Sequence, residues 1–173
     1  MEDALETSLL EALDGQQLNC LNEDAPAHTL RDIVSAKQLN TSPDAFLLSD
    51  VDEQLILTIP FNQMVRVRAL VLTSKGPAAQ RPVRAKIFVN VPTLGFDDAT
   101  TLPPVQELEL TETQLTQGAR IPLRFVRFQS VNSLHIFIES NGGDEQTRID
   151  GVDVLGTQAG TTRDLSGLRV TEE

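Results

Sequence analysis

The chain has 173 residues, of which 40% are hydrophobic and 4% aromatic, and its formal net charge is −11. A negatively charged protein repels nucleic-acid phosphates and anionic membrane surfaces, so neither class of partner is expected. No run of about 18 apolar residues predicts a membrane-spanning helix, and a single cysteine cannot form a disulfide within the chain.

The first predicted element is a short amphipathic helix over residues 2–13, because Leu5, Leu9 and Leu13 recur every four residues. We expect residues 1–17 to form a helical extension that precedes the main domain. The first six residues contain three acids and no base, so we expect no signal peptide. Residues 28–36 predict a second helical stretch between two turns.

From residue 46 onward, apolar residues recur at every second position, which is the period of a β-strand. Glycine and proline separate the segments, and few helical patterns interrupt them. The chain therefore predicts an all-β fold, an antiparallel sandwich or barrel, with a tail over residues 159–173. The predicted strands cover residues 55–59, 65–72, 83–90, 105–110, 121–129, 133–140 and 148–155.

The sequence contains little that points to catalysis. The only histidines are His28 and His135, and no nucleophile elbow or phosphate-binding glycine loop is present. We expect His135 to be a half-buried or surface residue of its strand, and Cys20 to be a packed residue between apolar neighbours. The acids at residues 50, 52 and 53 raise the question of calcium, but an acidic turn is the simpler interpretation. We predict no catalytic, cofactor-binding or metal-binding residue.

Six cations lie on three of the predicted strands of this acidic chain. Arginine side chains recognise carboxylates well, so one interpretation of the cations is a surface for an acidic partner. The alternative is that they pair with the excess acids of the chain itself. The six residues are Arg66, Arg68, Arg84, Lys86, Arg124 and Arg127.

Several blocks of the sequence, in the same order, resemble the PITH domain, a module of thioredoxin-like proteins that associate with the proteasome. The resemblance covers roughly residues 18–158. The longest blocks are LLSDVDEQLILTIPFNQ (47–63), IPLRFVRFQ (121–129) and VNSLHIFIESN (131–141), and shorter ones are CLNE (20–23), KIFVN (86–90), LELT (108–111), TRI (147–149) and LGT (155–157).

The resemblance implies a jelly-roll-like β-sandwich of the galactose-binding type, over residues 18–158. It implies a non-catalytic docking module for the 26S proteasome, chiefly its regulatory particle, in the cytoplasm and nucleus. Some family members carry a thioredoxin domain before this module; none precedes it in these residues, so we expect no redox activity. We assign the docking contacts to Arg66, Arg68, Arg124 and Arg127, with the tail over residues 159–173 as a second contact, and expect a monomer without cofactors.

Two other functions compete with docking. Sandwiches of the galactose-binding type often bind sugars at one loop rim, which here predicts a small-ligand or carbohydrate site at residues 91–104 or 141–147. The lack of Trp and Tyr argues against sugar stacking. An enzyme acting through paired carboxylates or Cys20 is the remaining alternative.

Overall fold

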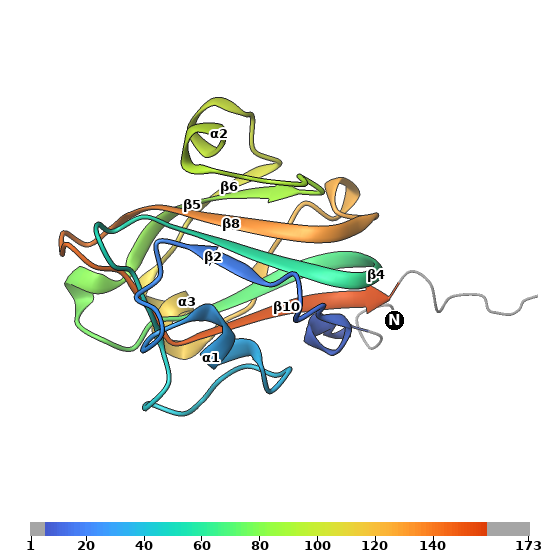
Figure 1. Cartoon of the computed structure of the whole chain (residues 1–173). Helices are drawn as coiled ribbons and strands as arrows, with labels where there is room; N and C mark the ends of the chain where they lie inside the picture. Colours follow the sequence, from blue (N-terminus) through green and yellow to red (C-terminus); the bar gives the residue numbers. More distant parts are fainter. Residues whose placement is uncertain (1–5, 159–173) are drawn as a thin grey trace, which may run out of the picture.

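A computed structural model of the chain describes residues 6–158 (Figure 1). The predicted tail over residues 159–173 lies outside the described residues, as do the first five residues of the predicted N-terminal extension. The described part is the predicted all-β, jelly-roll-like sandwich, and its strand pairs are antiparallel. Among residues 6–158, no helix is long and apolar enough to cross a membrane.

One sheet of eight strands makes up most of the fold, and β3 pairs with β9 in a separate two-stranded sheet. The path through the large sheet is β1-β10-β4-β8-β5-β6, with β2 and β7 also paired to β4. The strands are β1 (Thr7–Ser8), β2 (Asn19–Leu21), β3 (Leu47–Leu48), β4 (Leu55–Thr73), β5 (Pro82–Val89), β6 (Gln106–Glu109), β7 (Ile121–Pro122), β8 (Val131–Asn141), β9 (Arg148–Ile149) and β10 (Gly151–Gln158).

Short helices connect the strands, and Figure 1 shows α2 on the opposite side of the strands from α1 and α3. The centre of the helix predicted over residues 28–36 is confirmed as α1. Thr29 is the N-cap of this helix. Its hydroxyl accepts the N–H of Asp32, and the carboxylate of Asp32 accepts the N–H of Thr29. The helices are α1 (Leu30–Val34), α2 (Phe96–Thr101), α3 (Glu112–Gln117) and the 3₁₀ helices η2 (Leu9–Ala12), η3 (Ala78–Gln80) and η4 (Phe125–Arg127).

Strand β4 is central to the large sheet, because this strand runs through nearly the whole length of the sheet (Figure 1). Its first half pairs with β2 and β8, and its second half pairs with β10 and β7. The sequence predicts two strands here, over residues 55–59 and 65–72. The structure joins them into one, and the pairing to β8 is irregular between Pro60 and Val65.

A β-bulge in β4 changes which side chains face the core. Val67 pairs with Gly156 and Ala69 with Leu155, so Arg68 has no partner in the β10 ladder. The extra residue shifts the alternation of the strand. The core therefore takes Val65 and Val67 before the bulge but Leu70 and Leu72 after it.

The N-terminal segment is not the predicted α-helix in the part that the structure describes. Thr7 and Ser8 pair with β10, and only residues 9–12 form a 3₁₀ helix. Leu9, Leu10 and Ala12 are almost completely buried against the sheet. Leu9 and Leu13 both lie in the core, because one turn of 3₁₀ helix followed by extended chain also places residues four apart on the same side. Leu5 lies outside the described residues.

The strand predicted over residues 121–129 is wrong beyond its first two residues. Only Ile121 and Pro122 form β7, after which the chain makes the 3₁₀ helix η4. Pro122 has no N–H to donate to a ladder, so the strand does not continue. This irregular segment is the part of the chain that carries Arg124 and Arg127.

Candidate functional site

Two backbone hydrogen bonds hold the segment 123–128 against the middle of β4. The N–H of Leu123 donates to the carbonyl of Arg68 at 2.9 Å, and the N–H of Val67 donates to the carbonyl of Phe128 at 2.9 Å. The bulge in β4 therefore lies against the irregular segment that follows β7. The sequence predicted the charges of this region but not the contact between its two segments.

This contact brings the four predicted docking arginines onto neighbouring segments. We call Arg66, Arg68, Arg124 and Arg127 the arginine surface. Arg66 and Arg68 are partly exposed in β4, and Arg124 and Arg127 are exposed on the adjacent segment. The arrangement places four arginines on two adjoining segments of a chain whose net charge is −11.

Arg68 is held by an aromatic ring and by nearby charge. Its guanidinium carbon lies 4.2 Å from the centroid of the Phe125 ring, a cation–π distance. Its Nε is buried and has no hydrogen-bond partner among the described residues. Beside it, Arg120 makes a bidentate ion pair with Glu6, at 2.8 and 2.9 Å. The hydrogen bond from Arg120 lowers the pKa of Glu6, and the charge of Arg68 adds a smaller effect in the same direction.

The guanidinium groups of the arginine surface make no ion pair within the described part of the chain, although Arg68 lies near enough to Glu6 to lower its pKa. Arg66, Arg68, Arg124 and Arg127 form no ion pair with a carboxylate of residues 6–158. Apolar side chains lie in the same segments: Val126 is 75% exposed and Met64 is 44% exposed. Exposed cations interleaved with exposed apolar groups are typical of protein-binding surfaces rather than of a solvated face.

The other two predicted cations behave differently. Arg84 contacts Glu109 at 2.7 Å, Glu107 at 3.7 Å and Glu139 at 3.9 Å, and Lys86 contacts Glu139 at 3.7 Å. These pairs bridge β5 to its neighbours β6 and β8. For Arg84 and Lys86, the interpretation as internal ion pairs is therefore confirmed.

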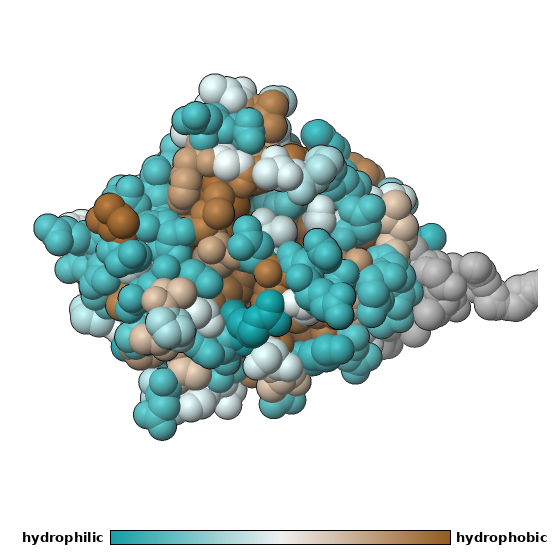
Figure 2. Space-filling model, viewed as in Figure 1, coloured by the Kyte–Doolittle hydropathy of each residue, from teal (hydrophilic) through white to brown (hydrophobic). Residues whose placement is uncertain are grey.

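A second candidate site is a groove of about 440 Å³ on the outer face of β2, β4 and β8. Figure 2 shows apolar surface, in brown, gathered beneath α2 on this side of the molecule. Every residue of the groove is uncharged, although 23% of the chain is charged. The lining residues are Gln16, Gln17, Leu18, Asn19, Leu21, Thr58, Pro92, Thr93, Leu94, Gly95 and His135.

His135 lies at the floor of this groove and is not the half-buried or surface histidine that the sequence predicts. Its side chain is buried, with Nδ1 at 3.0 Å from the Thr58 hydroxyl and Nε2 at 3.1 Å from the Ser133 hydroxyl. Burial lowers its pKa to about 4, because a charged imidazolium is costly in this environment. A neutral imidazole with both nitrogens hydrogen-bonded is a structural residue rather than a free base.

One of the two predicted ligand loops contributes to the groove. Residues 92–95, from the predicted loop 91–104, form one wall. The other loop, 141–147, is closed by the side-chain amide of Asn141, which donates to the carbonyls of Asp144 and Gln146 and to the hydroxyl of Thr147.

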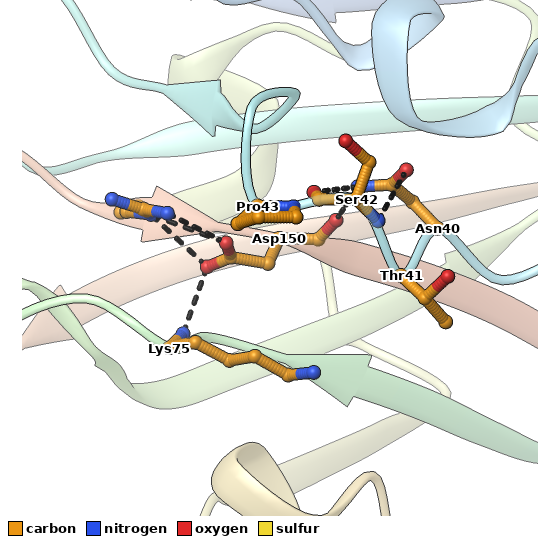
Figure 3. A pocket seen from close by; sticks show the side chains of 7 residues that line it. Asn40, Thr41, Ser42, Pro43, Lys75 and Asp150 are labelled. Atoms are coloured by element: carbon orange, nitrogen blue, oxygen red, sulfur yellow. Dashed lines mark hydrogen bonds and ion pairs between the residues drawn. The ribbon is translucent and has the colours of Figure 1, made fainter.

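A third feature is a pocket of about 250 Å³ between the loop at residues 40–43 and the end of β4 (Figure 3). Lys75, Arg148 and Asp150 complete its lining. Arg148 pairs with the buried Asp150 at 2.8 Å, and its guanidinium carbon stacks 3.8 Å from the Phe46 ring centroid. Arg148 and Asp150 neutralise each other, so Lys75, which has no ion pair among residues 6–158, gives the pocket its net positive charge.

Cys20 and the acidic turn carry no site in the described structure. Cys20 is a packed residue, as predicted, and burial raises its pKa well above the usual value for a thiol. The carboxylate of Asp52 accepts hydrogen bonds from Asn22 and from the N–H of Gln54, as expected of a turn. Within residues 6–158, no three His, Cys, Asp or Glu side chains are grouped closely enough to hold a metal ion.

The sequence is similar to one family along its whole length. The family model for the PITH domain matches residues 1–173. Thioredoxin-like protein 1 of Schizosaccharomyces pombe is 41% identical over 157 residues, covering 88% of this chain and 52% of that protein. PITH domain-containing protein 1 of Homo sapiens is 28% identical over 137 residues, covering 79% of this chain and 63% of that protein. The chain therefore spans about half the length of the first relative and under two thirds of the second.

Solved structures share the fold at low sequence identity. The family 32 carbohydrate-binding module of NanJ from C. perfringens, solved with galactose, has a TM-score of 0.62 at 9% identity. The structural match covers 87% of this chain and 98% of the module. A second such module, from a family 31 glycoside hydrolase of Clostridium perfringens, has a TM-score of 0.59 at 12% identity over 90% of this chain and 97% of the module. The likeness identifies a galactose-binding-like sandwich.

Proposed function

The chain belongs to the PITH domain family, and we propose that it is a non-catalytic docking module that binds the regulatory particle of the 26S proteasome. The observation that carries the proposal is the arginine surface: four guanidinium groups on two adjoining segments form no ion pair with the described carboxylates. Family membership and the sandwich fold support a binding module in general.

The chemistry of this surface defines the partner contact that it fits. Arginine binds carboxylates in a planar, bidentate geometry and tolerates partial desolvation better than lysine does. We infer an acidic partner surface with an apolar centre, which Val126 and Met64 would contact. On a chain of charge −11, one positive region also orients the encounter, because the rest of the molecule is repelled by the same partner.

The backbone of the arginine surface is held in place before binding, which favours docking of a preformed surface over folding on binding. The backbone of the arginine surface is hydrogen-bonded to β4, and Arg68 is additionally stacked on Phe125. Side chains that are ordered before binding lose less conformational entropy on binding. The tail over residues 159–173 remains a second predicted contact, outside the described residues.

The chemistry of the described side chains supports a non-catalytic role. His135 has both ring nitrogens occupied, and the Cys20 thiol is buried with a raised pKa. Neither is suited to act as a base or nucleophile. We propose further that the module acts as a monomer, without a cofactor, in the cytoplasm and nucleus, where this partner is found.

Direct binding tests the proposal. The purified chain is immobilised and exposed to purified regulatory particle and, as a control, to the isolated 20S core particle. Saturable binding to the regulatory particle, with no binding to the core, is the expected result. Equal binding to both, or no binding at micromolar concentration, would contradict it.

A second candidate function rests on the uncharged groove. The side chains of Gln16, Gln17, Asn19 and Thr93 make no hydrogen bond within the described structure, so they are available to a ligand. A volume of about 440 Å³ is in the range of small-ligand sites. This favours a small neutral polar ligand, of which carbohydrates are one class. A thermal-shift screen of neutral sugars tests this function, and an Asn19→Leu variant should lose any shift.

A further inference from the structure

The loop between α1 and β3 carries an exposed serine followed by proline. Thr41, Ser42, Pro43 and Asp44 are all exposed and belong to no helix or strand. Among the nine prolines of the whole chain, Pro43 is the only one preceded by serine or threonine. Proline restricts the residue before it to extended backbone.

The side chain of Asn40 holds the backbone of this loop, including that of Ser42, although Ser42 itself is exposed. The side-chain amide of Asn40 donates to the carbonyls of Ser42 at 3.1 Å, Ala45 at 2.9 Å and Asp150 at 2.8 Å. Within residues 6–158, the Ser42 hydroxyl accepts one hydrogen bond, from the N–H of Asp44 at 3.3 Å. A substituent on this hydroxyl therefore displaces one weak contact and leaves the anchor intact.

A cation lies across the pocket from this loop. Figure 3 shows residues 40–43 on one side and Lys75 on the other, with Asp150 between them. The carboxylate of Asp150 is satisfied by Arg148 and by the N–H of Lys75. The Lys75 ammonium has no ion pair with a carboxylate of residues 6–158, so the pocket carries one positive charge in excess.

We propose that Ser42 is a phosphorylation site for a proline-directed serine/threonine kinase, and that Lys75 pairs with the phosphate. In the reaction the Ser42 Oγ attacks the γ-phosphorus of ATP. An Oγ–P bond forms and the bond to ADP breaks, while the hydroxyl proton passes to the catalytic base of the kinase. In Figure 3 the hydroxyl points away from Lys75, which leaves it open to an enzyme; rotation about Cα–Cβ then turns the phosphate to the pocket.

The modification would be separate from the arginine surface. Lys75 follows Arg68 by seven residues of mostly extended chain, which spans roughly 23 Å. A phosphoserine adds about −1.5 to −2 charges at neutral pH. Phosphorylation at Ser42 thus changes the charge of a second face without touching the guanidinium groups that we propose for docking, and it rests on observations independent of that proposal.

Mass spectrometry of the folded chain tests the site. The native protein is incubated with a proline-directed kinase and Mg·ATP, and the products are mapped. The expected result is one phosphate, on Ser42. Ser42→Ala should lose the incorporation, Pro43→Ala should lose most of it, and Ser130→Ala, at another exposed serine, should lose none. No phosphate on the wild type, or equal incorporation into Ser42→Ala, would overturn the proposal.

The role of Lys75 has its own readout. Phosphorus NMR of the phosphorylated chain measures the second pKa of the phosphoserine, which is near 6 when it is exposed. A neighbouring ammonium favours the dianion, so this pKa should be lower in the wild type than in Lys75→Met. Equal values in the two proteins would overturn the pairing with Lys75.

Discussion

Arg68 stacks on Phe125, with 4.2 Å between its guanidinium carbon and the ring centroid, and so joins the bulge of β4 to the 3₁₀ helix η4. The two residues are 57 positions apart in the chain. Because Arg68 is the unpaired residue of the bulge, its side chain is free to lie over a segment that does not extend the sheet.

Replacing Phe125 by leucine tests this contact. A cation–π pair of this kind contributes about 0.5–1 kcal/mol, and leucine keeps most of the apolar area. We expect Phe125→Leu to lower the free energy of unfolding by about 1 kcal/mol, measured by urea denaturation. Val126→Ala, at the exposed neighbour, should change it by less than about 0.5 kcal/mol. Equal stability of the wild type and Phe125→Leu would show that the stacking is not energetically significant.

Gly156 is required by the same bulge. A Cβ at this position would collide with the carbonyl oxygen of Arg66, which belongs to the backbone and cannot rotate away. We expect Gly156→Ala to lower the free energy of unfolding by roughly 2–3 kcal/mol, the upper range for overpacking.

Gly95 is the matched control for this substitution. A Cβ there would meet nothing closer than an Asp98 carboxylate oxygen at 3.8 Å, so Gly95→Ala should be tolerated within about 0.5 kcal/mol. Thermal unfolding followed by circular dichroism measures both variants. Equal midpoints for Gly156→Ala and Gly95→Ala would contradict the geometry of the bulge.

His135 predicts how stability depends on pH. Its pKa is about 4 in the folded protein and about 6.5 when unfolded, so the unfolded chain binds the proton first as the pH falls. The stability that this pKa shift contributes is therefore fully present above about pH 6.5. It is lost as the pH falls toward 4, by about 3 kcal/mol in total.

The slope between pH 6.5 and 5 isolates His135 from most carboxylates, which titrate lower. We expect denaturation midpoints to fall across this interval in the wild type and to be nearly flat in His135→Gln. The variant is less stable overall, so slopes rather than absolute values are compared. A wild-type stability that is constant from pH 6.5 to 5 would contradict the burial of a neutral imidazole.

Cys20 should be unreactive in the folded protein. Its burial raises the thiol pKa, so little thiolate is present at pH 8 and access is restricted. We expect labelling by a disulfide reagent to be at least about tenfold slower in the native chain than in the chain unfolded in guanidinium. Rapid labelling under native conditions would instead indicate that β2 opens readily.

The alternation of apolar residues was sufficient to predict an antiparallel sandwich or barrel and most strand positions, and the resemblance to the PITH domain selected the sandwich. The core of β4 takes Leu55, Leu57 and Ile59 on one face, as a period of two requires. The pattern failed where the backbone departs from regular geometry. Alternation after Val67 assumes no extra residue, whereas the bulge at Arg68 reverses the faces.

The same limit applies to the candidate sites. The sequence identified six cations but not which of them find carboxylates, because Glu139 reaches Arg84 and Lys86 only through the pairing of β5 with β8. The groove could not be predicted from the sequence either, since its floor brings together Thr58 and His135 from different strands. The proline at residue 122 was the one local signal that the following residues leave the sheet.

The measurement that tests the docking account most directly is co-migration of the purified chain with purified 26S proteasome on a native gel, at low and moderate salt. The account predicts that wild-type chain co-migrates at low salt and is lost as salt rises. Arg124→Glu/Arg127→Glu should not co-migrate, whereas Lys37→Glu/Lys75→Glu, with the same charge change at other exposed positions, should. Undiminished co-migration of the Arg124→Glu/Arg127→Glu variant would contradict the arginine surface, and no co-migration of the wild type would contradict docking itself.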